Sequence, residues 1–282
     1  MSATMRIDAH QHFWRIAQRR DHWPPPSLAP LYRDFTPADL VPCLQRCRID
    51  GTVLVQSLPT SEDTALLLNL AARRAFVLGV VGWVDMKADD AGIRIAALAQ
   101  HRKLKGLRPM LQDIADEHWI DDPALDPAVA AMLAHGLSLD ALVKPQHLPA
   151  LLAFARRHAR LPIVIDHAAK PDIARADWQP WHRHMTALAA LPNVHCKLSG
   201  LLTEAGSNRD DAVLQPCIDH LFASFGASRL MWGSDWPVLN LAGDYDGWFA
   251  MSHRLCAAQP GIDDAALDAI FGGNARLFYR LD

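Results

Sequence analysis

The sequence predicts an α/β fold, a single-domain (β/α)8 barrel of the TIM barrel type, and three observations predict it. Eight short apolar runs recur along the 282 residues, as expected for parallel strands that are buried on both faces. Segments with helical periodicity separate these runs, and this alternation is typical of a parallel sheet. No glycine-rich phosphate loop follows the first run, which disfavours an open dinucleotide-binding sheet and a nucleotide cofactor. We expect one barrel to span residues 1–282.

The predicted elements follow one another in chain order. The strands cover approximately Met5–Ala9, Gly51–Gln56, Val77–Val84, Leu104–Pro109, Gly136–Leu142, Pro162–Asp166, Asn193–Leu198 and Leu230–Ser234. Start signals mark three of the helices, near Thr36, Ser61 and Leu148. Before the first helix, the segment from Phe13 to about Pro37 carries two tryptophans and three consecutive prolines. We expect it to form a long loop, which either shapes a pocket or only covers the barrel mouth.

The composition is that of an ordinary globular protein. Half of the residues are hydrophobic, 21% are charged and the formal net charge is -3, which excludes the basic surface of a nucleic-acid-binding protein. The five cysteines are odd in number and widely spread, which argues against a disulfide framework and for a reducing compartment. The sequence shows no signal-peptide pattern and no run of roughly 18 apolar residues. We therefore expect a cytoplasmic protein with no membrane or nucleic-acid partner.

Histidines mark the end of the first predicted strand. His10 and His12 are two residues apart, so on a strand both imidazoles can face the same side and reach the barrel mouth. The similar pair His182 and His184 lies in a predicted helix, where residues two apart diverge and no shared metal ion is expected. Only the first pair is therefore a candidate for the functional site.

Polar residues follow the other predicted strands in the same way. They are Gln56, Asp85, Arg108, Asp140, His167, Lys197 and Asp235. Because parallel strands of a barrel converge at one end, apolar strands that end in such groups assemble an active site there.

Taken together, several motifs resemble a known family. IDAHQHFW, VIDHAAKP, CKLSGL, MWGSDWP and GGNARLFY look like the sugar-lactonase branch of the amidohydrolase superfamily, and the resemblance covers essentially the whole chain. Within that branch the sequence is similar to L-fuconolactonases and L-rhamnonolactonases, and more distantly to 2-pyrone-4,6-dicarboxylate lactonases. The resemblance implies an amidohydrolase-like barrel and a small-molecule sugar lactone as substrate.

The resemblance also implies roles for individual residues. His10 and His12 match residues that bind a divalent metal in some relatives and substrate oxygens in others, His167 matches the strand-6 histidine, and Asp235 matches the general base that activates water. Lactone hydrolysis needs such a base and a donor that faces the developing oxyanion. Arg108, Lys197 and His167 are the candidate donors. For Lys197, pairing with a carboxylate inside the barrel is the alternative.

Other residues are candidates for substrate binding. Gln56, Asp85 and Asp140 are expected to bind substrate hydroxyl groups, with structural ion pairs as the alternative for the two aspartates. Trp14 and Trp236 would form an apolar wall beneath a sugar ring, unless they simply belong to the core.

Three further polar residues near the strand ends are expected to be structural. Asp8 and Asp166 precede pocket histidines and are expected to point away from them, while His195 is expected to be a core histidine.

The metal content stays open at this point. Many superfamily members carry a bridging lysine or glutamate on strand 4 and a histidine on strand 5, where this sequence offers Arg108 and Asp140. A two-metal centre is therefore not expected. A single site made by His10, His12, His167 and Asp235 is compatible with zinc, but the resemblance equally implies relatives in which the metal is absent or dispensable. Asp235 would then be a metal ligand, a base or both.

The leading hypothesis is the hydrolysis of a sugar-acid lactone, L-fuconolactone or a related aldonolactone, to the free acid. Two alternatives remain: a metal-dependent decarboxylase of the same superfamily, and a barrel that binds a sugar acid without converting it. The sequence does not decide the oligomeric state.

Overall fold

Eight parallel strands form a barrel in chain order. The structure, a computed structural model, describes residues 4–19 and 23–282. Each strand pairs with the next along the chain. The strands are β1 (Ile7–Gln11), β2 (Gly51–Val55), β3 (Val77–Gly82), β4 (Leu104–Leu107), β5 (Ser138–Ala141), β6 (Ile163–Ile165), β7 (Val194–Leu198) and β8 (Leu230–Trp232). The predicted fold is confirmed, and so are all eight predicted strands.

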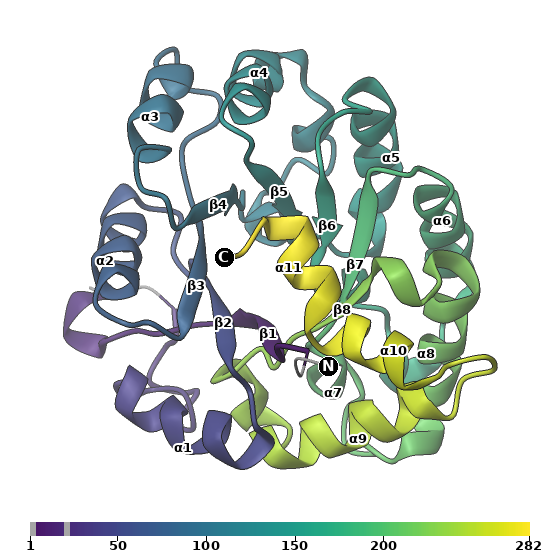
Figure 1. Ribbon diagram of the computed structural model, residues 1–282. Coiled ribbons are helices and arrows are strands. Elements are labelled where there is room, and N and C mark those ends of the chain that lie inside the picture. The colour runs from purple at the N-terminus through teal and green to yellow at the C-terminus, as the bar shows by residue number, and fades with distance from the viewer. Residues whose placement is uncertain (1–3, 20–22) are drawn as a thin grey trace.

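Helices surround the strands (Figure 1). They are α1 (Pro37–Cys47), α2 (Ser61–Ala72), α3 (Ala91–Leu98), α4 (Asp126–Ala134), α5 (Leu148–Arg157), α6 (Gln179–Ala189), α7 (Leu201–Glu204), α8 (Asp211–Phe225), α9 (Tyr245–Ala257), α10 (Asp264–Asp268) and α11 (Asn274–Tyr279). The three predicted start signals are confirmed. Thr36 and Asp39 form a capping box at α1, Thr60 caps α2 directly before Ser61, and α5 begins at Leu148.

The barrel closes between its first and last strands through the residues that follow them. Gln11 and Trp236 form an isolated parallel bridge. The Asp235 amide donates to the His10 carbonyl and the His12 amide donates to the Trp236 carbonyl, each at 2.8 Å. His10, His12 and Asp235 therefore lie side by side at the seam, the place where the end of β1 meets the residues after β8.

The interior of the barrel is apolar at one end. Small and branched side chains such as Ile7, Val53 and Val81 pack there against Phe278 and Tyr279. Phe278 and Tyr279 belong to α11, which lies across the centre of the strand ring in Figure 1. Because α11 fills this end, the polar residues at the carboxyl ends of the strands face the opposite opening.

The segment between β1 and α1 is the expected long loop. Apart from a 3-10 turn at Ile16–Gln18, its described residues have no helix. Its two ends are tied together, because Trp14 and Phe35 exchange backbone hydrogen bonds of 3.0 and 2.9 Å.

Two further expectations concern cysteines and membranes. All five cysteines are free thiols, as the sequence predicted. None of the helices in residues 4–19 and 23–282 combines the length and the apolarity needed to cross a membrane.

Candidate active site

A cavity of about 440 Å³ opens at the carboxyl ends of the strands. Its lining combines four residues singled out from the sequence with a larger set that was not. The lining residues are His12, Trp23, Ser57, Arg108, Met110, Gln112, Asp113, Leu142, His167, Lys170, Thr203, Glu204, Asp235, Val238 and Leu241. Three of the four catalytic candidates, Arg108, His167 and Asp235, thus share one concave space, as expected for a barrel enzyme.

Three histidines surround the Asp235 carboxylate. Asp235 Oδ1 lies 3.3 Å from His12 Nε2, 3.8 Å from His10 Nε2 and 3.9 Å from His167 Nε2. The two strand-1 rings approach each other as well, with their Nε2 atoms 3.2 Å apart. The structure therefore brings together the four residues that the sequence offered as a metal site.

The other ring nitrogen of each histidine has its own partner. Nδ1 lies 2.8 Å from the Val55 carbonyl in His12, 2.8 Å from Ser199 Oγ in His167 and 3.3 Å from Asp166 Oδ1 in His10. We assign Nδ1 as the protonated nitrogen of His12, because its partner is a carbonyl oxygen, which can only accept. At His10 Nδ1 the Lys197 ammonium lies 3.2 Å away beside the Asp166 carboxylate.

The backbone after β7 sets the position of His167. Gly200 has a φ of 64°, and a Cβ at this position would lie 2.7 Å from His167 Nδ1. Glycine is therefore required both by the left-handed backbone and by the close approach of the imidazole.

The pKa values around Asp235 follow from burial and from neighbouring groups. Burial lowers the pKa of His167 to about 4 and, together with the Lys197 ammonium, holds the pKa of His10 well below its ordinary value. Burial would raise the pKa of Asp235, but its interactions with His167, His12 and His10 outweigh it and lower the pKa. At neutral pH, Asp235 is therefore ionised beside neutral His10 and His167.

Beneath the cavity floor lies a buried network of charges. Lys197 Nζ is 2.6 Å from Asp140 Oδ2 and 3.0 Å from Asp166 Oδ1, and all three side chains are fully buried. Arg108 Nη1 lies 3.2 Å from the other oxygen of Asp166. Tyr279 donates to Asp140 at 2.7 Å and so links α11 to this network. Two cations thus face two carboxylates, which is the balance that buried charges need.

Asp166 has the predicted structural role, but the prediction that it points away from the pocket histidines is wrong. Its carboxylate contacts Arg108, Lys197 and His10 inside the barrel. Strand β6 ends at Ile165, and the residues from His167 to Lys170 all have positive φ angles. This left-handed turn breaks the alternation of a strand, so neighbouring side chains reach the same interior. Asp8 does turn away, and accepts hydrogen bonds from Ser234 and Tyr245.

Three residues predicted to contact the substrate are paired with protein groups instead. Lys197 lies under His10 between two carboxylates. Such pairing inside the barrel was the alternative to a role as oxyanion donor. Gln56 is fully buried and exchanges hydrogen bonds with Arg108, donating to its carbonyl and accepting from its guanidinium. The Asp140 carboxylate likewise accepts hydrogen bonds from Lys197 and Tyr279. Of the six predicted donors and hydroxyl-binding residues, Arg108 and His167 line the cavity.

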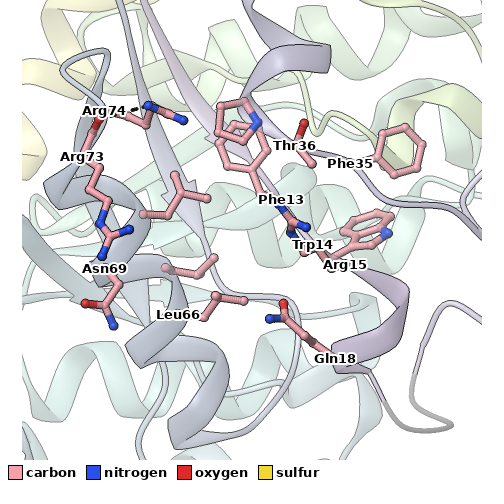
Figure 2. A pocket seen from close by; sticks show the side chains of 13 residues that line it. Phe13, Trp14, Arg15, Gln18, Phe35, Thr36, Leu66, Asn69, Arg73 and Arg74 are labelled. Carbon is pink, nitrogen blue, oxygen red and sulfur yellow. Dashed lines mark hydrogen bonds between the residues drawn. The ribbon is translucent and has the colours of Figure 1, made fainter.

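Asp85 and the two tryptophans lie outside the described cavity lining. Asp85 is exposed and caps the following turn, where it accepts from the Lys87 amide. Trp236 is buried edge-on against Phe13 and Phe35, so it belongs to the core. Trp14 lines a separate cavity of about 450 Å³ between the β1–α1 loop and α2 (Figure 2). That cavity contains none of the site histidines.

The sequence did not single out the residues that complete the cavity wall. Lys170 stands in a quoted motif, VIDHAAKP, but it was given no role, and Glu204 lies beyond the CKLSGL motif. Their Nζ and Oε1 atoms are 4.0 Å apart. A lysine three residues after a strand-end histidine was the sequence signal available for Lys170, and no local pattern marked Glu204.

The site fits a divalent cation. Ligand atoms of His10, His12 and Asp235 all lie within 4.8 Å of one another, and so do those of His10, Asp166 and His167. The Nε2 atoms of three imidazoles lie within 3.9 Å of one carboxylate oxygen, so nitrogen and oxygen ligands of four residues surround one point. A nitrogen and oxygen ligand set of this kind suits zinc, and each histidine is held by the partner on its Nδ1.

Known proteins are similar to this chain over nearly its full length. An L-fucono-1,5-lactonase from Burkholderia ambifaria is 58% identical, over 99% of this chain and 97% of the relative. An L-fucono-1,5-lactonase from Burkholderia multivorans is 38% identical, over 98% and 96%. The crystal structure of a Burkholderia multivorans amidohydrolase with bound zinc superposes with a TM-score of 0.91, at 38% identity and over 99% and 100% of the two chains. A model of the amidohydrolase family matches residues 7–281, and the chain belongs to this family.

Proposed function

We propose that this protein hydrolyses the lactone of a sugar acid, L-fucono-1,5-lactone or a related aldonolactone, to the free acid. The observation that carries the proposal is the Asp235 carboxylate, held among three histidines in a cavity large enough for a single sugar ring. The similarity to two lactonases over nearly the full length supports the same chemistry. It does not favour the decarboxylase or the non-catalytic sugar-binding barrel.

In the proposed reaction, Asp235 takes a proton from water as the water oxygen bonds to the lactone carbonyl carbon. His167 and Arg108, which line the same cavity, are placed to face the carbonyl oxygen as it gains negative charge. The bond from the carbonyl carbon to the ring oxygen then breaks, and Asp235 returns its proton to the leaving oxygen. The product is a hydroxy acid, and the base is regenerated.

We further propose that His10, His12, His167 and Asp235 hold a single divalent ion, with zinc as the candidate. Such an ion would act as a Lewis acid toward the carbonyl oxygen. Arg108 Nη1 already lies 3.3 Å from His10 Nε2, so a cationic side chain shares this electron pair. The site therefore holds positive charge near the carbonyl oxygen with or without the ion, and we propose that the metal is dispensable.

The test is a pH-indicator assay of acid release from a panel of aldonolactones. It would use purified protein with its metal content measured, before and after chelation and after zinc addition. Acid release from a stereochemical subset that includes L-fucono-1,5-lactone, abolished by Asp235→Asn, is the expected result. No release from any lactone under any metal condition would overturn the proposal.

A further inference from the structure

The pair formed by Lys170 and Glu204 stands on the wall of the catalytic cavity. Lys170 ends the left-handed turn after β6, and Glu204 is the last residue of α7, after β7. Both side chains line the cavity, with 25% and 27% of their surface exposed. Two charged groups from different parts of the chain thus meet the same space as Asp235.

The hydrogen-bonding capacity of this pair is unused. Lys170 Nζ and Glu204 Oε1 are 4.0 Å apart, beyond the range of a direct hydrogen bond. Neither side-chain group has another hydrogen-bond partner among residues 4–19 and 23–282. An ammonium group offers three donors and a carboxylate accepts through two oxygens, so both remain available to a ligand.

The negative charge of Asp235 also affects the pKa of Glu204. Burial raises the pKa of Glu204, the Lys170 ammonium opposes this effect, and the Asp235 carboxylate adds to it. Glu204 and Asp235 also line the same cavity, so the two carboxylates face one space.

Adjacent hydroxyl groups match this arrangement. Each hydroxyl both donates and accepts, so two neighbouring hydroxyls can accept from Lys170 and donate to Glu204 at the same time. A lactone without hydroxyl groups would displace water from both charged groups and form no hydrogen bonds in its place. A site with charged groups that need hydroxyl partners therefore discriminates strongly against such a lactone. The nearby Val238 and Leu241, on a turn that contacts α7, supply apolar surface for the rest of the ring.

We infer that Lys170 and Glu204 bind hydroxyl groups of the substrate and restrict this site to polyhydroxylated lactones. The inference rests on the proposed lactonase function and adds to it the residues that select the substrate. Neither residue contributes to the proton transfers assigned to Asp235.

The test compares two lactones in wild-type protein and in the variants Glu204→Gln and Lys170→Gln. The first is the best aldonolactone of the panel, and the second is δ-valerolactone, an unsubstituted ring that is followed as a substrate or as a competitive inhibitor. In either variant we expect KM for the aldonolactone to rise roughly tenfold while kcat stays within about threefold, as for the loss of one charge-assisted hydrogen bond. The KM or Ki of δ-valerolactone should not change.

Glu62→Gln is the matched control, because Glu62 is an exposed glutamate that lines a different surface pocket. Equal losses for both lactones, or unchanged KM for the aldonolactone, would overturn the assignment of Lys170 and Glu204 and leave the lactonase proposal standing. Wild-type protein that hydrolyses no lactone would overturn both.

Discussion

Asp166 gives the most direct test of the buried charge network. Its carboxylate lies 3.0 Å from Lys197 Nζ, 3.2 Å from Arg108 Nη1 and 3.3 Å from His10 Nδ1, and the side chain has no exposed surface. The substitution Asp166→Asn keeps the shape of the side chain but removes its charge. Two buried cations then face the single carboxylate of Asp140.

The expected cost is large because solvent cannot replace the lost charge. Removing one partner of a buried ion pair typically costs about 3–5 kcal/mol, whereas exposed pairs contribute about 0–1 kcal/mol. For a chain of this size, 1 kcal/mol corresponds to roughly 2–4 °C in Tm, so Asp166→Asn should lower Tm by roughly 6–20 °C. Urea unfolding, followed by circular dichroism, would measure the free energy of unfolding directly.

A matched variant separates burial from charge. Asp85→Asn removes an exposed carboxylate and should change the free energy of unfolding by less than about 1 kcal/mol. If Asp166→Asn cost no more than Asp85→Asn, the network beneath the cavity would not be the stabilising element described here.

Three further outcomes are expected. Asp235→Asn should lower kcat for lactone hydrolysis by about 10²–10⁴-fold, the usual contribution of a positioned base, as measured by acid release. Gly200→Ala should reduce activity by displacing His167, whereas Gly261→Ala, which has a similar φ but no atom within 4 Å of the new Cβ, should leave kcat/KM unchanged. Burial, with a smaller contribution from Arg229, lowers the pKa of His195 to about 4 from an unfolded value near 6.5. Above pH 6.5 the neutral His195 side chain does not weaken the fold, and stability is lost as the pH falls from 6.5 toward 4. His195→Gln should therefore flatten the dependence of Tm on pH between 4 and 6.5.

The results that would contradict these expectations are specific. Full activity of Asp235→Asn would remove it from the proposed mechanism. Equal activity losses in the two glycine variants would show that the strained backbone, and not the contact with His167, determines the effect. A Tm profile of His195→Gln parallel to that of the wild type between pH 4 and 6.5 would show that other groups dominate acid sensitivity.

The strands were predictable because their burial on both faces leaves a signal in composition. Runs such as Gly51–Val55 are buried at every residue and mostly apolar, and the turns that follow them carry polar residues at the same end of the barrel. The histidines and Asp235 could be found for the same reason. The roles of these residues remain proposals, but their meeting in one place follows from strand order alone.

The placement of other residues depended on features that a strand pattern does not contain. Asp166 lies inside because the backbone turns left-handed directly after β6, and four consecutive residues with positive φ, three of them alanine or lysine, are not predicted by local preference. Gln56 and Lys197 also follow strands, yet their side chains pair with protein groups from other strands. Position at a strand end therefore predicts that a residue is near the site, but not whether it faces the ligand.

Because the candidate site lies at the seam between β1 and β8, its assembly depends on the order in which the chain is synthesised. His10 and His12 emerge first from the ribosome, while Asp235, whose amide binds the His10 carbonyl, follows more than two hundred residues later. A nascent chain has no assembled site until the final strand has been synthesised and has met the first. A chain that stops before Asp235 would therefore lack the hydrogen bonds that join the end of β1 to the residues after β8.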